Sequence, residues 1–225
     1  MAATRRSWFV RRGSTVATKE EDPLARTSTA AISDCLNRFG AMAADIKRLS
    51  GATLFGVAFT ARTMAGESST LHRAVAAAPS GSILVVDAGG YVGRAVWGEI
   101  LSVAAVARGL RGAVIDGAVR DIDAIRSMGF PLFARAHTPA GPHKGWRGDW
   151  GRSVSCGGVV VEPGDLVIGD GDGVVVVPGA DAPQVRAAVK ARLELEGGWR
   201  LRIEAGESSV AVLGLDNDGS ATEGS

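Results

Sequence analysis

The feature that most constrains the fold is an uninterrupted apolar run at residues 83–86, within the segment SILVVDAGG. A strand covered on one face alternates apolar and polar residues, whereas a run without alternation is typical of a strand buried on both faces. Such strands occur in parallel sheets covered by helices. A second short apolar run, GAVI at residues 112–115, follows one helical segment later. The sequence therefore predicts an α/β domain with a partly parallel first half.

Helical and strand-like segments alternate around these two runs. We expect helices within residues 28–40, 69–79, 93–109, 121–129 and 181–206, and strands within 53–64, 82–90, 112–115 and 131–136. Ser28 or Thr29 would cap the first helix, and Gly197-Gly198 would break the last one. In the 93–109 segment, Val96, Ile100, Ala104 and Ala107 have helical spacing.

The second half of the chain has a different pattern. Residues 154–178 are expected to form strands joined by turns, because Pro163-Gly164-Asp165 and Gly171-Asp172-Gly173 are turn sequences. We therefore expect a β-rich second half. The 16-residue stretch HTPAGPHKGWRGDWGR, residues 137–152, looks like a long connection, and connections of that length are often functional.

Composition bounds the class of protein. The 25 Lys and Arg residues nearly balance 24 Asp and Glu residues, unlike the basic surfaces that bind nucleic acids or membranes. No apolar run approaches the ~20 residues of a membrane span. Cys35 and Cys156 have no pairing pattern, which predicts a reducing, cytoplasmic location. We expect a polar extension at 1–26, one folded domain at 27–214 and a disordered tail at 215–225.

The pair Arg120-Asp121 admits two interpretations. It follows the GAVIDGAV segment and precedes a helical pattern, so Asp121 could simply be the N-cap of the next helix while Arg120 faces solvent. On the other hand, ligands bind at the carboxyl ends of strands in open α/β sheets. There a guanidinium can bind a carboxylate or enolate oxygen, and a carboxylate can hold Mg²⁺ through one ligand. Spacing alone favours the first interpretation.

A resemblance to a known family changes that balance. The motifs ISDCLNRFG, LHRAVAAAPSGSILVVDAGG, VWGEIL, GAVIDGAVRD, GGVVVEPGDLVIGDGDGVVVVP and LEGGWRLRIEAG resemble, in this order, the regulator-of-ribonuclease-activity A-like (RraA-like) family. That family includes class II pyruvate aldolases such as 4-hydroxy-4-methyl-2-oxoglutarate aldolase. The resemblance covers roughly residues 28–206. It implies that residues 27–214 form an RraA-like catalytic domain with a swivelling β/β/α-type fold.

The resemblance also implies a site. Asp121 would be the direct protein ligand of Mg²⁺ or Mn²⁺, and Arg120 would contact the keto or enolate oxygen of a pyruvate-like substrate. The segment Gly98, Glu99, Ile100 and Leu101 would bind substrate at a helix start, where backbone N–H groups of Gly98 and Leu101 receive its carboxylate. Glu99 would hold a metal-bound water.

One expected site residue comes from another subunit. The family borrows an acidic residue from a neighbouring C-terminal region, and Glu196 matches it best, with Glu194 as the alternative. Either could instead be a solvated helix carboxylate. One departure from the family pattern is Ala124, where an acidic residue is common, although Asp123 lies beside it. This departure would affect residues that support the metal.

The implied activity is metal-dependent cleavage of 4-hydroxy-2-oxo acids, of the 4-hydroxy-4-methyl-2-oxoglutarate or 4-carboxy-4-hydroxy-2-oxoadipate type, to pyruvate, together with oxaloacetate decarboxylation. The implied assembly is a homotrimer or hexamer with its site at a subunit interface. The alternative function is a protein that binds and inhibits a ribonuclease of the E type. A demethylmenaquinone methyltransferase is disfavoured, because no cofactor-binding glycine loop follows a strand.

Other polar residues carry weaker signals. The GDGDG segment at 169–173 is followed by valines rather than by the closing Glu of a calcium loop, so we expect a hairpin turn. His72, His137 and His143 lack zinc spacing, and His72 is expected on a helix face. His137, Lys144 and Arg147 could form a basic rim that attracts a dicarboxylate, or be solvated.

Overall fold

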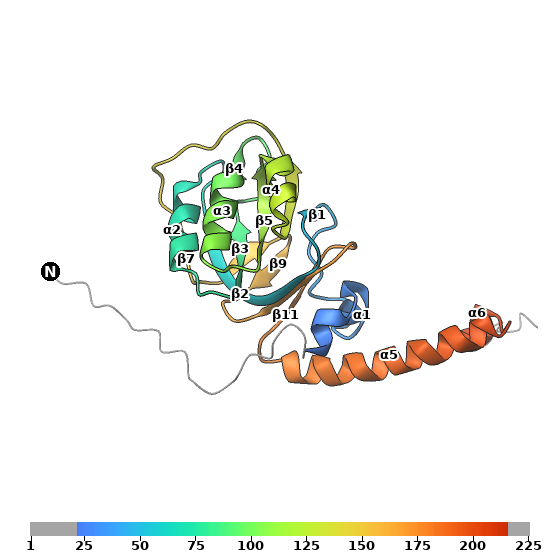
Figure 1. Cartoon of the computed structure of the whole chain (residues 1–225). Helices are drawn as coiled ribbons and strands as arrows, with labels where there is room; N and C mark the ends of the chain where they lie inside the picture. The colour runs from blue at the N-terminus through green and yellow to red at the C-terminus, as the bar shows by residue number, and fades with distance from the viewer. Residues whose placement is uncertain (1–21, 216–225) are drawn as a thin grey trace, which may run out of the picture.

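Parallel strands form the centre of the molecule (Figure 1). The computed structural model describes residues 22–215. One nine-stranded sheet has the order β1-β6-β5-β3-β2-β10-β11, with β4 paired to β5 and β7 paired to β2. Its strands are β1 (Lys47–Ser50), β2 (Leu54–Arg62), β3 (Ser82–Asp87), β4 (Ala95–Trp97), β5 (Gly112–Val119), β6 (Leu132–His137), β7 (Asp149–Trp150), β10 (Leu166–Gly169) and β11 (Val174–Val177). A separate hairpin consists of β8 (Val154–Cys156) and β9 (Val159–Val161).

The two apolar runs lie where the sequence predicts. β3 pairs in parallel with β2 on one side and β5 on the other, and Val85 is opposite Val114. β5 is buried along its whole length. β10 and β11 add to the sheet in antiparallel fashion, as the turn-rich second half predicts. The predicted α/β class is confirmed: the chain is a single domain with a curled mixed sheet.

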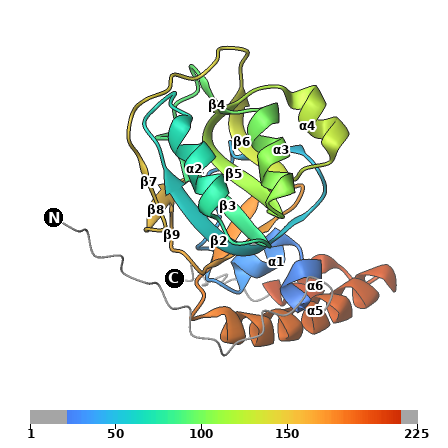
Figure 2. The ribbon, with the colours of Figure 1, turned by 60° about the vertical axis from the view of Figure 1, so that its left-hand side comes forward.

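Helices cover the sheet unevenly (Figures 1 and 2). They are α1 (Thr29–Asp34), α2 (Ser69–Ala77), α3 (Glu99–Ala107), α4 (Ile122–Met128), α5 (Ala182–Glu204) and α6 (Ser209–Leu213), with a 3-10 helix, η1, at Pro23–Arg26. α2, α3 and α4 lie together on one face of the sheet, where residues such as Leu71, Leu101 and Ile125 form an apolar core with β3 and β5. In that core the ring of Trp97 stacks on Phe130 at a centroid distance of 6.2 Å.

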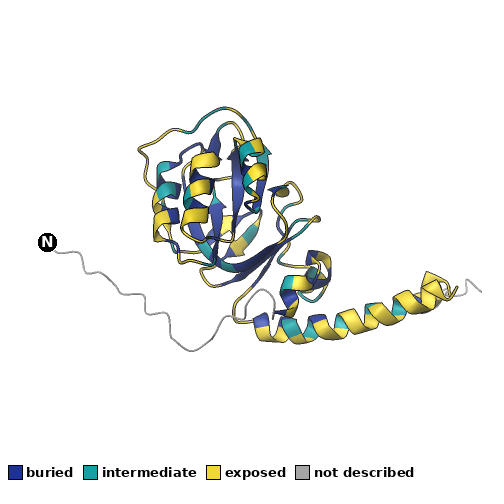
Figure 3. Ribbon diagram, in the orientation of Figure 1, coloured by how far each residue is buried: buried dark blue, intermediate teal, exposed yellow. Residues whose placement is uncertain are grey.

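Different elements close the other side. The β8–β9 hairpin contributes Val154, Cys156 and Val161 to a second core with residues of β3 and β5. A third core joins α1, the first turns of α5 and the strands β10 and β11. Beyond those turns α5 extends away from the sheet and is exposed over most of its length (Figure 3).

Three element predictions need correction. Val96, expected in the same helix as Ile100, is not helical but lies in β4, and Ile100 is 69% exposed. The buried face of α3 instead carries Leu101 and Ala105, because the helix begins only after Gly98. The helix predicted for 28–40 ends at Asp34, and Asn37 and Arg38 follow with positive φ angles.

The predicted break in the last helix is also wrong. α5 continues without interruption through Gly197 and Gly198. A glycine in a helix interior costs about 1 kcal/mol relative to alanine, which weakens a helix without ending it.

The ends of the chain are described in part. Residues 1–21 of the expected extension and 216–225 of the expected tail lie outside the described residues. The end of the expected extension, residues 22–26, includes η1: Leu24 is buried, and the Asp22 carboxylate accepts hydrogen bonds from Arg186. Within residues 22–215, no helix combines the length and apolar character that crossing a bilayer requires.

Candidate active site

The candidate site lies where β4 and β5 end beside each other. β4 pairs in parallel with β5, with Trp97 opposite Val119, and the backbone N–H of Arg120 donates to the carbonyl of Trp97 at 2.9 Å. This pairing places Gly98 and the start of α3 against Arg120 and Asp121. Trp97 is held in turn by a hydrogen bond from its indole N–H to the Ser102 hydroxyl at 2.8 Å.

Asp121 has an unusual backbone conformation. Its φ is +59° and its ψ is +38°, the left-handed region that few residues other than glycine adopt. Asp121 occupies the predicted N-cap position of α4, but its side chain makes no capping hydrogen bond to that helix. The Asp121 Oδ2 atom instead accepts a hydrogen bond from the backbone N–H of Glu99 at 3.1 Å. The carboxylate thus caps α3, where the helix dipole favours an anion.

Arg120 and Asp121 form a partly exposed ion pair. The Arg120 Nε atom lies 3.4 Å from Asp121 Oδ2, and the two side chains are 42% and 38% exposed. Both charged groups therefore remain accessible to a ligand. The remaining N–H groups of the first turn of α3 have no carbonyl partner inside the helix, so an anion can bind there as well.

Gly98 is required for this close approach. A Cβ atom at Gly98 would lie 2.6 Å from Asp121 Oδ2, closer than such atoms pack, and would make a tight contact of 3.0 Å with Arg120 Cγ. Its φ of −163° is open to any residue, so the requirement is space and not backbone freedom. Any side chain at position 98 would displace the Arg120–Asp121 pair.

A buried carboxylate organises the start of α2. Glu67 is fully buried and accepts hydrogen bonds from the Thr63 hydroxyl, from the Ser69 N–H and hydroxyl, and from the Thr70 N–H. Burial alone would raise the pKa of Glu67, but the hydrogen bonds from Ser69 and Thr63 outweigh it and lower that pKa. Glu67 therefore caps α2 in place of Ser68, the residue at the N-cap position, whose side chain makes no capping bond.

The long connection between β6 and β8 is fixed to this helix start. The N–H of His143 donates to the carbonyl of Gly66 at 2.7 Å, and the N–H of Ser68 donates to the carbonyl of His143 at 3.2 Å. The N–H of Gly148 also donates to the Thr70 hydroxyl at 3.0 Å. These bonds hold Lys144, next in the chain to His143, over the start of α2.

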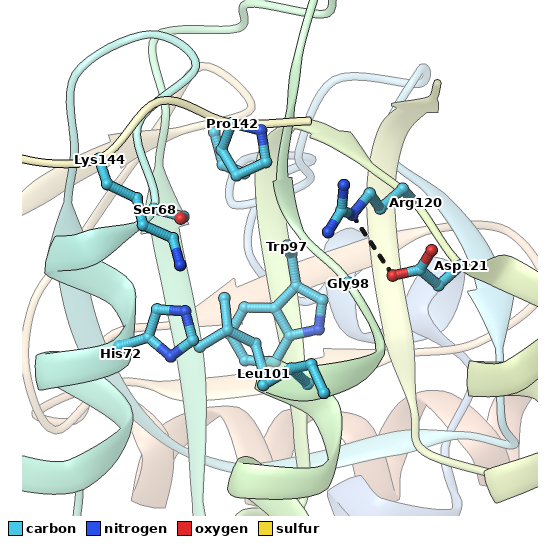
Figure 4. Close-up of a pocket in the computed structure, with 11 residues that line it drawn as sticks. Ser68, His72, Trp97, Gly98, Leu101, Arg120, Asp121, Pro142 and Lys144 are labelled. Carbon is cyan, nitrogen blue, oxygen red and sulfur yellow. Dashed lines mark ion pairs between the residues drawn. The ribbon is translucent and has the colours of Figure 1, made fainter. Parts of the chain in front are cut away.

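These elements enclose a pocket of about 120 Å³ (Figure 4). Its lining residues are Ser68, His72, Val96, Trp97, Gly98, Ile100, Leu101, Arg120, Asp121, Pro142 and Lys144. Arg120 and Asp121 lie on one side in Figure 4, and Ser68, His72 and Lys144 lie on the other. The pocket therefore has two polar walls, which are separated by the apolar side chains of Trp97 and Leu101.

Most residues named from the sequence meet in this pocket. Gly98, Ile100, Leu101, Arg120 and Asp121 all line it. Glu99 does not, although its backbone bonds to Asp121; its side chain is exposed in the first turn of α3.

Glu196 is placed elsewhere in the chain. It lies on α5 and accepts a hydrogen bond from Arg192 at 2.5 Å. α5 runs along the far end of the sheet from the β4–α3 junction (Figure 1). A single copy of the chain therefore does not bring Glu196 to Arg120 and Asp121.

Sequence reasoning missed the second wall. His72 was expected only on a helix face, and Ser68 was not singled out, yet both line the pocket. Burial, then the charge of Lys144, lower the pKa of His72, although Glu67 opposes them. Lys144, expected at a basic rim or in solvent, lines the pocket, whereas His137 and Arg147 do not. The sequence feature that could have identified Ser68 as a site residue is its position at a helix start directly after Glu67, which can provide the capping bonds in its place.

Three further residues have structural roles. Asp116 is buried and accepts hydrogen bonds from Arg135 and from the N–H of Gly157. Asp170, in the GDGDG segment, accepts hydrogen bonds from the N–H and hydroxyl of Thr29, and the segment forms the β10–β11 turn. Cys156 is buried, and burial raises the pKa of its thiol well above the usual range, so it is no nucleophile.

Comparison with known proteins identifies the family of the chain. The family model RraA-like, described as Aldolase/RraA, matches residues 29–176. The chain belongs to the RraA-like family. A relative from Halalkalibacterium halodurans is 38% identical over 151 residues, which are 67% of this chain and 72% of the relative. That relative carries the provisional name 4-hydroxy-4-methyl-2-oxoglutarate aldolase.

Solved structures of other proteins have the same fold. An uncharacterized protein from Pseudomonas syringae pv. tomato aligns with a TM-score of 0.76 and 27% identity, covering 93% of this chain and 100% of that one. The RNA-processing inhibitor RraA from Thermus thermophilis aligns with a TM-score of 0.62 and 29% identity, covering 68% of this chain and 93% of that one. The family thus includes proteins with an aldolase name and a protein with an inhibitor name.

Proposed function

We propose that this RraA-like protein is a divalent-metal-dependent lyase that cleaves 4-hydroxy-2-oxo acids to pyruvate. The observation that carries the proposal is the Arg120–Asp121 pair, which faces the N-terminus of α3 inside a pocket. A guanidinium, an accessible carboxylate and free helix N–H groups are what a 2-oxo acid with a metal partner requires. The aldolase name of the Halalkalibacterium relative supports the same substrate class.

The donor set fits a hard cation that keeps most of its water. Among residues 22–215, no three His, Cys, Asp or Glu side chains come together to form a metal cage. Asp121 offers one accessible carboxylate, and Mg²⁺ is commonly held by one or two carboxylates with water and substrate as the other ligands. Asp121 would hold Mg²⁺ or Mn²⁺, which would act as a Lewis acid on the substrate carbonyl.

Residues of the chain would bind the substrate and assist the proton transfer. The first turn of α3, from Gly98 to Leu101, would bind the C1 carboxylate, and Arg120 would contact the C2 oxygen. A water held by Glu99 or Glu196 would take the proton from the C4 hydroxyl. The C3–C4 bond then breaks, so that C4 becomes a carbonyl and the bonding electron pair stays on the other half, which forms as pyruvate enolate. Return of the proton from the water to C3 of the enolate then gives pyruvate. Arg120 would stabilise the negative C2 oxygen, a contribution often worth about 3 kcal/mol per donor.

Oxaloacetate decarboxylation would use the same groups. Loss of CO₂ also breaks the C3–C4 bond of a 2-oxo acid and leaves the same pyruvate enolate. We therefore propose oxaloacetate decarboxylation as a second activity of this site, with Arg120 in the same role.

The active form would be a homotrimer or hexamer. α3 exposes Ile100, Val103 and Val106 at 69%, 49% and 49%, and α5 exposes Leu193 and Leu201 at 45% and 69%. Exposed apolar helix faces of this kind are typical of protein interfaces. In such an assembly, α5 of one subunit would bring Glu196, or Glu194, to the pocket of its neighbour.

A cytoplasmic location accompanies the proposal. Neither Cys35 nor Cys156 forms a disulfide. Free cysteines are usual in a reducing compartment such as the cytoplasm.

A pyruvate-release assay tests the activity. Purified protein would be incubated with 4-hydroxy-4-methyl-2-oxoglutarate, 4-carboxy-4-hydroxy-2-oxoadipate or oxaloacetate, in Mg²⁺, in Mn²⁺ or in excess EDTA. We expect pyruvate release that EDTA abolishes and added metal restores. Full activity after metal removal, or none on any of the three acids, would contradict the proposal.

The second candidate function is inhibition of a ribonuclease by direct binding. The similarity to the Thermus RNA-processing inhibitor favours it. Capture of a ribonuclease of the E type by the purified protein, with reduced RNA cleavage and no lyase activity, would favour inhibition over catalysis.

A further inference from the structure

The long connection after β6 passes next to the side chain of Arg120. The N–H of Thr138 donates to the carbonyl of Val119 at 2.9 Å, and the N–H of Ala95 donates to the carbonyl of Ala140 at 2.9 Å. These bonds attach the connection to the end of β5 and to the start of β4, the two strands that form the candidate site. The connection is therefore fixed to the same strands that carry Arg120.

Gly141 is the residue of the connection that lies against the Arg120 guanidinium. A Cβ atom at Gly141 would lie 2.9 Å from Arg120 Nη1 and 3.9 Å from Arg120 Cζ. The φ angle of Gly141 is not positive, so the backbone there accepts other residues and the glycine is needed for space. Asp121 lies near Nε of the same guanidinium. The guanidinium is thus confined at two of its nitrogens, by Asp121 and by Gly141.

Arg94 holds Gly141 in this position. Its Nη1 atom donates a partly buried hydrogen bond to the carbonyl of Gly141 at 3.1 Å. The aliphatic part of Arg94 packs on Gly66, where an added Cβ atom would lie 3.3 Å from Arg94 Cβ and 3.4 Å from Arg94 Cδ. The carbonyl of Gly66 in turn accepts a hydrogen bond from the N–H of His143 at 2.7 Å. Arg94 therefore contacts the main chain on both sides of Pro142, which lines the pocket beside Arg120 (Figure 4).

We propose that Arg94 and Gly141 are positioning residues that determine where the Arg120 guanidinium meets the C2 oxygen of the substrate. The inference rests on the proposed lyase function and adds two residues to its machinery. Neither residue lines the pocket, so both act through Arg120.

This role predicts a particular kinetic effect. The metal ligand Asp121 and the first turn of α3 hold the substrate in its ground state, and neither contacts Arg94 or Gly141. Negative charge on the C2 oxygen is greatest in the transition state, so a misplaced Arg120 lowers kcat more than it raises KM.

Gly141→Ala tests the contact with Arg120 directly. The new Cβ meets the far end of a flexible side chain, so the guanidinium moves and the fold survives. In Mg²⁺, kcat for 4-hydroxy-4-methyl-2-oxoglutarate and for oxaloacetate should fall at least about tenfold, with KM within about threefold of wild type. Gly171→Ala is the matched control, because its Cβ would make an ordinary contact of 3.9 Å with Arg48 Nη2. It should change neither constant.

Arg94→Met tests the link between Arg94 and Gly141. We expect kcat to fall about five- to tenfold, because the connection is no longer held against Arg120. Arg94→Lys should recover most of this loss, since an ammonium can also donate to the Gly141 carbonyl. Arg48→Met removes a guanidinium from the exposed strand β1 and should leave kcat unchanged. Circular dichroism and the melting temperature of each variant establish that it is folded.

Crystal structures of the variants provide a measurement that does not depend on turnover. In Gly141→Ala and Arg94→Met, the Arg120 guanidinium should move by about 1 Å or more, a displacement large enough to impair a reacting site. The main chain of residues 98–101 should keep its wild-type position. A change confined to stability would leave the guanidinium where it is.

The outcomes distinguish this inference from the proposed function. Unchanged kcat in Gly141→Ala, or an unmoved Arg120 guanidinium in both variants, would overturn the positioning role even if the wild-type chain releases pyruvate. A wild-type chain that cleaves none of the acids would overturn the lyase. A guanidinium that still moves in the two variants of that chain would support the control of Arg120 by Arg94 and Gly141.

Discussion

The carboxylate of Asp121 accepts a hydrogen bond from the backbone N–H of Glu99 at 3.1 Å, although 22 positions separate the two residues. The side chain that precedes α4 thus caps α3. Because Asp121 has a positive φ, its carboxylate turns away from its own helix and toward the pocket. This geometry ties the proposed metal ligand to the helix that would bind the substrate carboxylate.

Asp121→Asn should abolish metal-dependent turnover while the protein stays folded. Asparagine tolerates a positive φ, so the backbone should survive, whereas the neutral amide is a poor ligand for Mg²⁺. We expect pyruvate release to fall at least about 100-fold. Loss of part of the cap should cost about 1 kcal/mol. Asp123→Asn, whose side chain is fully exposed, is the control. Unchanged turnover in Asp121→Asn would count against the site.

Gly98→Ala should damage the site more than the fold. The new Cβ would lie 2.6 Å from Asp121 Oδ2, the movable end of a side chain, so the carboxylate must shift. We expect at least about tenfold lower kcat/KM, since small displacements at a reacting site are costly, with a melting temperature within a few degrees of wild type. Gly197→Ala, in the exposed part of α5, should instead slightly raise stability. A fully active Gly98→Ala variant would show that this close approach is dispensable.

Glu67 should make stability dependent on acid pH. Its folded-state pKa is lowered from 4.5 by the hydrogen bonds that overcome its burial, so the unfolded chain binds the proton more readily. The stabilisation is therefore present above about pH 4.5 and is lost as the pH falls through the lower folded-state pKa. Glu67→Gln should be less stable at pH 7 by about 1 to 3 kcal/mol. Its free energy of unfolding should also fall less between pH 6 and pH 3 than that of the wild type.

Urea titrations at several pH values measure this difference. Glu204→Gln, on the exposed end of α5, serves as the control and should follow the wild-type curve. Parallel pH profiles for wild type and Glu67→Gln would contradict the assignment.

Glu196 should act across a subunit interface. Glu196→Gln should lower turnover by at least about tenfold without unfolding the chain, because its carboxylate would help the water that takes the proton. If Glu194 fills this role, Glu194→Gln should show the loss instead. Size-exclusion chromatography should show that the active species is a trimer or hexamer. An active monomer would contradict a role for Glu196 across the interface.

Mixed oligomers make this test sharper. Asp121→Asn and Glu196→Gln subunits, each with strongly reduced activity alone, would combine an intact Asp121 from one chain with an intact Glu196 from its neighbour. Random mixing in a ring should restore about a quarter of the wild-type sites. No recovery in verified mixed oligomers would mean that both residues act from the same chain.

The parts of the fold that could be predicted are those with a local signature. The run at 83–86 is buried on both faces as β3, and that burial is visible in the sequence because no polar residue interrupts it. Val96 misled the helix prediction because its spacing to Ile100 matches a helix, while its pairing with β5 depends on residues far along the chain. Tertiary pairing overrode the local pattern there.

Only half of the candidate site could be predicted from the sequence. Arg120 and Asp121 stand together in the chain, and the resemblance to the RraA-like family assigned their roles. Ser68, His72 and Lys144 come from two distant segments, and their juxtaposition depends on main-chain bonds that leave no trace in residue type. The missing partner of the Ser68 hydroxyl is likewise a property of three-dimensional packing.

The connection that carries Lys144 is fastened through main-chain groups at Gly66, Ser68 and His143. Hydrogen bonds between backbone amide and carbonyl groups form whatever side chain is attached. The path of this connection along the pocket therefore does not depend on which of its side chains face inward. Lys144 and its exposed neighbours Trp146 and Arg147 can therefore change during evolution, or by mutagenesis, without changing the backbone path of the connection. The connection is thus a suitable place to alter which acids the pocket accepts while Arg120 and Asp121 stay the same.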